Sequence, residues 1–285
     1  MSEPFAVCWV CPRQCRLREG ETGFCRARAN RGGVVRSLNY GKVASAALDP
    51  IEKKPLYHFH PGSRILSIGT FGCNLHCPFC QNYAISQAGG EGFAGVPLPL
   101  EKAAPEEVTR ASARLAREAG NIGAAFTYNE PLVGYEFVYD TARLLKQAGL
   151  AVVLVTNGQI MRAPWERLLP FIDAVNIDLK GFAQDFYDWL GGDLAATKEA
   201  IRLAVLHGVH VEVTTLVIPT KNDGAEQMEQ ESAWLASVSP EIPLHLSRYF
   251  PRFQSYIDIT PLETLKRMER VARNYLRYVY LGNVR

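Results

Sequence analysis

Three cysteines stand close together in the stretch GTFGCNLHCPFCQN, residues 69–82. Cys73, Cys77 and Cys80 are separated by three and two residues, and no fourth cysteine follows them. Thiolates at such spacings can surround a cubane iron–sulfur cluster, which has four irons. Three ligands would leave one iron free, much as a catalytic zinc keeps one coordination position open. The spacing therefore predicts an open [4Fe–4S] site at which a substrate or cofactor binds.

Two zinc sites are the alternatives for this loop. In the first, His76 supplies the fourth ligand, although its position next to Cys77 makes chelation by both awkward. The second is a split zinc ribbon made by Cys8, Cys11, Cys77 and Cys80. The surrounding sequence favours the open cluster over either zinc site.

A second group of cysteines precedes this loop and consists of Cys8, Cys11, Cys15 and Cys25. Four soft ligands suit either a closed zinc site or a fully ligated iron–sulfur cluster. A second cluster could pass electrons to the open one, whereas zinc would only stabilise the small N-terminal segment. The spacing does not separate these two alternatives, and disulfides are the least favoured outcome in a reducing compartment.

The composition limits the class of protein. The chain has 285 residues, of which 47% are hydrophobic and 21% charged, so it can bury a large core. Lys plus Arg number 31 and Asp plus Glu 29, which gives no electrostatic basis for binding nucleic acid or an anionic membrane. The sequence shows neither a membrane span nor a signal peptide. We therefore expect a cytoplasmic protein without nucleic-acid or membrane partners.

Short apolar segments alternate with helical patterns from residue 65 onward. Strands are expected at 65–69, 122–127, 151–156, 173–178, 209–216 and 243–248, with a seventh at 277–281. Helices are expected at 105–119, 131–148, 164–170, 183–207 in two pieces, 223–238 and 261–275. Strict alternation of this kind predicts an α/β fold with a parallel sheet.

Polar residues alternate with apolar ones in three of the expected strands. The polar positions are Asn176, Asp178, Lys180, His210, Glu212, Thr214, His245 and Ser247. A closed barrel fills its interior with branched apolar residues, so these strands instead predict a concave face that lines a cavity. We expect a partial (β/α)6 TIM-like barrel over residues 65–285.

A small N-terminal cysteine-containing domain is expected over residues 1–64, with a hairpin near 34–40. The segment 88–105 is rich in Gly and Pro and long for a connection inside a compact domain. It is therefore a candidate lid over the cavity.

The cysteine loop CNLHCPFC resembles the C-x3-C-x2-C signature of radical S-adenosylmethionine (SAM) enzymes, with aromatic Phe79 before the last cysteine. Further blocks spread the resemblance over nearly the whole chain: CxxCPxxC, DPIEKKPLYHFHPG, TYNEP, VTNG, NIDLKG and YVYLGNV. Together they resemble the radical-SAM member of the AmmeMemoRadiSam group, which is similar to pyruvate formate-lyase activating enzymes. The resemblance implies the radical SAM core fold.

The resemblance also implies roles for individual residues. Cys73, Cys77 and Cys80 would ligate the [4Fe–4S] cluster, and the methionine part of SAM would chelate the fourth iron. The remaining implied contacts with SAM are those of Phe79 near the adenine, Thr127, Asn129 and Glu130 at the methionine ammonium, and Thr156 and Asn157 towards the ribose. Asp178 and Lys180 match the DLK of the activating enzymes.

Several of these residues have structural alternatives. The run Asn129–Glu130–Pro131 is also typical of a helix N-cap followed by proline, and both interpretations can hold together. Asp178 and Lys180 could simply neutralise each other on one strand face. His210, Glu212 and His245 lie on the expected cavity face, but buried histidines more often serve structure than ligand binding.

The sequence departs from the activating enzymes at two places. Val155 stands where they have an aspartate that helps to hold a monovalent cation, so that site is not expected here. Relatives in the group often continue into a short cysteine-containing tail, whereas this sequence stops at YVYLGNVR.

The implied reaction is reductive cleavage of SAM to methionine and a 5′-deoxyadenosyl radical, which abstracts a hydrogen atom from a substrate. That substrate is either a small molecule or a glycine in a partner protein. An external electron donor of the flavodoxin or ferredoxin type is required, and the resemblance adds Memo-like and AMMECR-like proteins as partners. The alternative is a non-catalytic scaffold that binds zinc or an iron–sulfur cluster.

Overall fold

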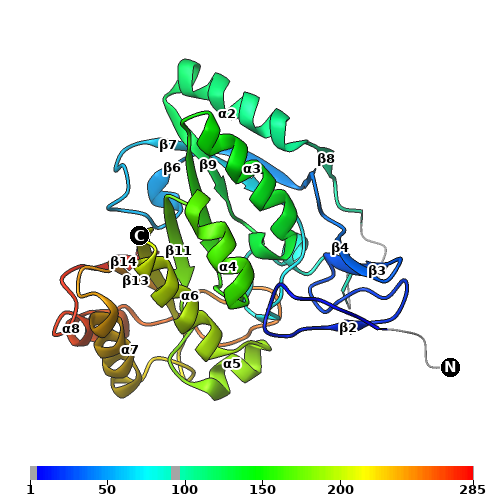
Figure 1. Ribbon diagram of the computed structural model, residues 1–285. Helices are drawn as coiled ribbons and strands as arrows, with labels where there is room; N and C mark the ends of the chain where they lie inside the picture. Colours follow the sequence, from blue (N-terminus) through cyan, green and yellow to red (C-terminus); the bar gives the residue numbers. More distant parts are fainter. Residues whose placement is uncertain (1–4, 91–96, 285) are drawn as a thin grey trace.

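An eight-stranded sheet forms the centre of the computed structural model, which describes residues 5–90 and 97–284 (Figure 1). Its order is β14-β13-β12-β11-β10-β9-β7-β6, and every neighbouring pair is parallel except β6 and β7. The strands are β6 (Ser45–Pro50), β7 (Arg64–Gly69), β9 (Asn121–Phe126), β10 (Ala151–Thr156), β11 (Ala174–Asp178), β12 (His210–Val217), β13 (Leu244–Arg248) and β14 (Val279–Gly282). The outer strands β6 and β14 do not pair, so the expected partial barrel is confirmed as an open one.

Helices connect the parallel strands in the expected order. They are α1 (Tyr83–Ser86), α2 (Pro105–Ala119), α3 (Tyr135–Gln147), α4 (Arg162–Leu168), α5 (Gln184–Leu190), α6 (Leu194–Leu206), α7 (Ala225–Val238) and α8 (Leu262–Ala272). The helical pattern at 183–207 is confirmed as two pieces, and Asp193 caps the second through Ala195 N–H. No helix in the described residues is long and apolar enough to cross a membrane.

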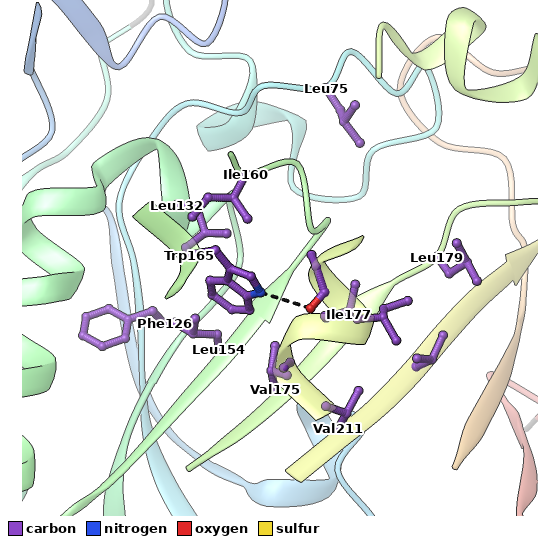
Figure 2. Close-up of a cluster of buried hydrophobic side chains, with 14 of the residues drawn as sticks. Leu75, Phe126, Leu132, Leu154, Ile160, Trp165, Val175, Ile177, Leu179 and Val211 are labelled. Carbon is purple, nitrogen blue, oxygen red and sulfur yellow. Dashed lines mark hydrogen bonds between the residues drawn. The ribbon is translucent and has the colours of Figure 1, made fainter. Parts of the chain in front are cut away.

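The main hydrophobic core lies between the sheet and these helices (Figure 2). Val175, Ile177 and Val211 project from β11 and β12 into this core. Trp165 of α4 is almost fully buried there, and its indole Nε1–H donates to Ala200 O of α6 at 3.0 Å. The apolar alternation of the strands therefore faces the helices, as the sequence predicts.

The opposite face of the sheet is filled at its N-terminal end by the connector between β6 and β7. Ile51 and Leu56 of this connector pack against Ile65, Ala125 and Val153 in a separate small core. The Asn176 side chain donates to Pro55 O at 2.8 Å. The connector thus covers part of the polar concave face, and only the C-terminal end of that face is free to line a cavity.

The N-terminal segment forms two short hairpins. Strand β1 (Ala6–Val7) pairs with β2 (Arg16–Leu17), and β3 (Arg28–Arg31) pairs with β4 (Val34–Ser37). The expected hairpin near 34–40 is therefore found over 28–37. Strand β6 lies before the expected boundary at residue 64 and yet belongs to the main sheet; the division into two domains stays a prediction.

The candidate lid at 88–105 is described only in part, because residues 91–96 lie outside the described residues. Beyond them, β8 (Glu101–Lys102) pairs with β5 (Lys42–Val43) in an antiparallel bridge. This end of the segment is thus attached to the N-terminal part of the chain.

Candidate active site

A cavity of about 380 Å³ opens at the C-terminal ends of the parallel strands. It is lined by all the residues that the sequence analysis assigned to the cluster and to SAM: Cys73, Cys77, Phe79, Cys80, Thr127, Asn129, Glu130, Thr156, Asn157, Asp178 and Lys180. They end or follow β7, β9, β10 and β11, whose carboxyl ends meet at one edge of the sheet. The structure therefore brings together residues spread over more than a third of the chain.

The three cysteines of the loop after β7 face this cavity. Cys77 is buried and Cys73 and Cys80 are partly exposed. Burial raises the pKa of the Cys77 thiol to about 12, raises that of Cys80, and, with the nearby Glu130 carboxylate, raises that of Cys73 well above its usual value. Such thiols give up their protons when a metal cation binds them. Three soft ligands at one cavity, without a fourth sulfur in the described lining, fit a [4Fe–4S] cluster with one free iron.

The structure forms neither of the zinc alternatives. The His76 ring packs against Phe24 at 6.1 Å between centroids and does not line the cavity. Cys8 and Cys11 line a different cavity from Cys77. Among the residues that the structure describes, no three His, Cys, Asp or Glu side chains converge on a position for a single metal ion.

Asn129 braces the beginning of the cysteine loop. Its Oδ1 accepts from Thr70 N–H at 2.9 Å, and its Nδ2 donates to Gly72 O at 3.0 Å. The side chain is buried and both ends are occupied by these bonds. Asn129 therefore positions the cysteines through the backbone of their own loop.

Glu130 joins the loops that follow β9 and β10. Its carboxylate accepts from Thr156 Oγ1 at 2.7 Å, Asn157 N–H at 2.8 Å and Leu132 N–H at 3.0 Å. Burial raises the pKa of Glu130 to about 7, and the three hydrogen bonds oppose that rise. Glu130 is also the N-cap of the 3₁₀ turn Pro131–Gly134, so the capping interpretation of this run is confirmed.

Asn157 reaches from the loop after β10 to the cysteine loop. Its Nδ2 lies 3.7 Å from Cys73 Sγ and 2.9 Å from Asn74 Oδ1. Its backbone carbonyl accepts from Thr197 Oγ1 at 3.1 Å, which ties it to α6. This network gives Cys73 a polar neighbour whose position is fixed by several elements.

Asp178 and Lys180 form an ion pair at the end of β11. Lys180 Nζ lies 2.7 Å from Asp178 Oδ2. Burial alone would lower the pKa of Lys180, but the Asp178 carboxylate and the Cys77 and Cys80 thiols raise it instead. The lysine is therefore a permanent positive charge close to the thiols, which favours an anionic cluster.

Phe79 forms part of the apolar wall of the cavity. Its buried ring lies 5.7 Å from that of Trp189 and 6.2 Å from that of Tyr249, between centroids. The packing fixes the ring at the edge of the cavity, where a flat apolar group could lie against it.

The cavity also has lining residues that were not found from the sequence, and two of them are charged or polar groups held by one carboxylate. Tyr128 and Lys53 also face the cavity, and both are held by Asp49 of β6. Asp49 Oδ2 accepts from Tyr128 OH at 2.6 Å and from Lys54 Nζ at 2.8 Å, while Oδ1 accepts from Lys53 Nζ at 3.1 Å. These bonds hold the pKa of Asp49 well below its usual value despite the opposing effect of burial. The aspartate and the two adjacent lysines in DPIEKK are the sequence signal that could have indicated this charged group.

His210, Glu212 and His245 do not line the cavity. The fully buried Glu212 carboxylate accepts from His245 Nε2 at 2.6 Å, His58 N–H at 2.7 Å, and Tyr57 N–H and His210 Nε2 at 3.0 Å. The cluster fastens the connector to the N-terminal end of the barrel. Its role here is structural.

A broad groove of about 1300 Å³ adjoins the cavity. Gln81, Asn82 and Asn283 line both spaces, so the groove leads directly to the cysteine loop. Its other walls come from the segments 250–255 and 281–284 after β13 and in and after β14. The groove is open to solvent and large enough to admit more than a small molecule.

A partial barrel whose C-terminal edge carries a cysteine tripod defines an enzyme that works with an iron–sulfur cluster. Residues 67–231 match the radical SAM superfamily, and the chain belongs to that superfamily. The chain is therefore an enzyme, and a [4Fe–4S] cluster and SAM are the cofactors of its family.

The chain is similar to proteins of archaea and bacteria. It is 40% identical over 280 residues to the uncharacterized protein MJ0808 of Methanocaldococcus jannaschii, covering 97% of this chain and 81% of that protein. It is 28% identical over 161 residues to a pyruvate formate-lyase-activating enzyme of Clostridium pasteurianum, covering 56% of this chain and 64% of that one. A radical SAM methyltransferase structure from Sphaerobacter thermophilus shares the fold at a TM-score of 0.58 and 19% identity, over 78% of this chain and 67% of that one.

Proposed function

We propose that the chain cleaves SAM reductively at an open [4Fe–4S] cluster held by Cys73, Cys77 and Cys80. The supporting observation is that these thiols share one cavity with the polar residues that follow three other strands. When bound, the cluster and SAM supply a 5′-deoxyadenosyl radical, which abstracts a hydrogen atom from the substrate. The protein supplies position, charge and a partly enclosed cavity for this chemistry.

The chain's own residues divide this work. Asn129 holds the cysteine loop, and Glu130 holds the loop after β10, so that both loops present a fixed surface to SAM. Thr127 lines the same cavity, and Phe79 supplies an apolar wall for the adenine. Lys180 places its positive charge beside the cluster thiols.

The substrate enters along the groove that shares Asn82 and Asn283 with the cavity. Its volume of about 1300 Å³ supports a substrate as large as a loop of a partner protein, as in glycyl-radical activation. The proposal extends to membership of the AmmeMemoRadiSam group, to Memo-like and AMMECR-like partners, and to a flavodoxin- or ferredoxin-type electron donor.

Cys77→Ala tests the proposal. The anaerobically reconstituted, reduced variant is expected to form no 5′-deoxyadenosine from SAM and to lose about four irons relative to the wild type. Its far-UV circular dichroism is expected to match the wild type, because the loop is braced by Asn129 and not by the thiol. Cleavage that survives in the variant contradicts the proposal. Wild-type protein that binds zinc in place of iron at the tripod supports the scaffold alternative instead.

A further inference from the structure

The four N-terminal cysteines gather around a second cavity, separate from the one that the proposed function uses. Cys8, Cys11, Cys15 and Cys25 all line it, together with the apolar residues Val10, Leu17 and Val133. Their backbones bring them there by tight turns. Cys8 N–H donates to Cys15 O at 2.9 Å across the β1–β2 hairpin, and Arg26 N–H donates to Gly23 O at 2.9 Å around Cys25. All four thiols are free.

The four sulfurs share the lining of one small cavity of about 10 Å³. Four thiolates around one space can bind either a single tetrahedral zinc or a fully ligated cubane. The metal that the protein takes up therefore separates these two alternatives.

Arg28 provides an independent sign of an anionic ligand. It lines the same cavity and is 2% exposed. Its two terminal nitrogens donate to Glu136 at 2.7 and 2.6 Å, but in the part of the chain described the buried Nε–H has no partner. Buried N–H groups rarely lack an acceptor. Arg28 also interacts electrostatically with Cys8 and Cys25, and it shares the lining of one small cavity with all four cysteines.

The site lies directly beside the tripod. Asn74, which follows Cys73 in the chain, lines the N-terminal cavity and interacts with Cys11. The same side chain accepts from Asn157 Nδ2 at 2.9 Å, and Asn157 approaches Cys73. The two groups of cysteines therefore lie on either side of one buried asparagine.

We propose that Cys8, Cys11, Cys15 and Cys25 bind a second, fully ligated [4Fe–4S] cluster, and that Arg28 Nε–H donates to one of its sulfurs. This goes beyond the proposed function, which needs only the tripod. The two centres are distinguishable because each can be emptied without touching the ligands of the other.

The test uses the triple variant Cys73→Ala/Cys77→Ala/Cys80→Ala, reconstituted anaerobically with ferrous iron and sulfide in the presence of zinc. The variant is expected to bind about four irons and about four sulfides, and the wild type about eight of each. Reduction of the variant should give the electron paramagnetic resonance signal of a cubane. Stoichiometric zinc without iron, or no bound metal, in the folded variant overturns the proposal. If the wild type and the triple variant both bind about four irons, the tripod holds no cluster, and this result would contradict the proposed function alone.

Arg28→Lys tests the donor. Lysine keeps the charge next to Glu136 but has no Nε–H at that position, so the second cluster is expected to have a lower reduction potential in the triple-variant background. Arg26→Lys is the matched control, because Arg26 donates to Gln87 and does not line the cavity. An unchanged potential in Arg28→Lys, or an equal shift in the control, overturns the role of Arg28.

Discussion

Gly72 of the cysteine loop lies directly against Cys25 of the N-terminal segment. A Cβ atom on Gly72 would lie 2.5 Å from Cys25 O and 2.7 Å from the Ala27 Cβ, both closer than real Cβ contacts allow. Gly72 also has φ of +90°, which other residues rarely adopt. The segment that carries four cysteines and the loop that carries three are therefore packed backbone against backbone.

Gly72→Ala is expected to destabilise the protein because it forces these two segments apart. Gly32→Ala is the matched control: Gly32 also has a positive φ of +65°, but a Cβ there meets nothing within 4 Å. The control should cost about 1 kcal/mol of unfolding free energy for its backbone conformation alone. Gly72→Ala should cost roughly 1–3 kcal/mol more through the clash. Denaturant unfolding measures both values, and equal losses would show that the contact is not tight.

The bond between Glu130 and Thr156 gives a second prediction. Three donors converge on the Glu130 carboxylate. In Glu130→Gln an amide N–H₂ would face one of these donors, which should lower the free energy of unfolding by roughly 1–3 kcal/mol. Thr156→Val removes one of these donors and leaves Gly158 N–H without its acceptor, at a cost of about 1 kcal/mol. Both variants should also bind SAM more weakly in the reconstituted protein.

Thr141→Val is the control for Thr156, because the buried Thr141 hydroxyl donates only to Phe137 O within its own helix. Its unfolding free energy should change less, and its SAM affinity should stay that of the wild type. A double-mutant cycle on Glu130 and Thr156 should show non-additive losses. Additive losses would mean that the two residues act independently.

Variants of Asp178 and Lys180 can show whether this ion pair contributes to SAM cleavage or only neutralises its own two charges. Removing either partner alone should cost roughly 1–3 kcal/mol of stability, because the partly buried charge that remains loses its partner. The double variant Asp178→Asn/Lys180→Met should regain part of that stability. If the pair serves only to neutralise itself, the double variant cleaves SAM at the wild-type rate; we expect the rate to stay reduced because the charge beside the thiols is gone.

The surface pair Glu199 and Arg202 on α6 is the comparison for this experiment. Their carboxylate and guanidinium lie 2.8 Å apart and are exposed, so their removal should change stability much less than removal of one partner of the Asp178–Lys180 pair. 5′-Deoxyadenosine formation should not change in Glu199→Gln/Arg202→Gln. A loss of cleavage there would indicate a general defect of the charge variants.

Local sequence signals account for much of the fold and for the identity of the cavity residues. Strand alternation placed Asp178 and Lys180 on the concave face, and the position after each strand placed Glu130 and Asn157 at the same edge. The face of Glu212 was also predicted correctly. The structural role that the sequence favours for the buried histidines beside it also agrees with the structure. The sequence does not reveal the partners of Glu212, because two of them are backbone N–H groups of Tyr57 and His58, far away in the sequence.

The same limit explains the residues that were missed. Asp49 holds Lys53 and Tyr128 at the cavity only because β6 adds to the sheet antiparallel to β7. No periodic pattern in the sequence predicts the pairing of β6 with β7, because a six-residue strand can pair in several ways. Likewise, the bond from Asn129 to Gly72 O involves a backbone acceptor, which residue types do not reveal.

Glu231 of α7 gives a prediction about the effect of pH on stability. Thr215 has one hydroxyl proton, which can be donated to Leu179 O at 3.0 Å, while its oxygen lies 2.5 Å from Glu231 Oε1. When the Thr215 proton is donated to Leu179 O, the contact between Glu231 Oε1 and Thr215 Oγ1 is a hydrogen bond only if Glu231 is protonated and donates to Thr215. Burial accordingly raises the pKa of Glu231 to about 8 from its usual 4.5.

The folded state therefore holds a proton on Glu231 that the unfolded state releases, and stability should fall as pH rises from about 4.5 to about 8. Over that window this one group contributes a slope of up to about 1.4 kcal/mol per pH unit. Glu231→Gln keeps a donor for Thr215 without a titrating proton, so it should remove that slope and be more stable than the wild type at pH 8. The control Glu226→Gln, exposed on the same helix, should keep the wild-type slope. If Glu231→Gln is less stable than the wild type at pH 8, the carboxyl is ionised in the folded protein and the assignment is wrong.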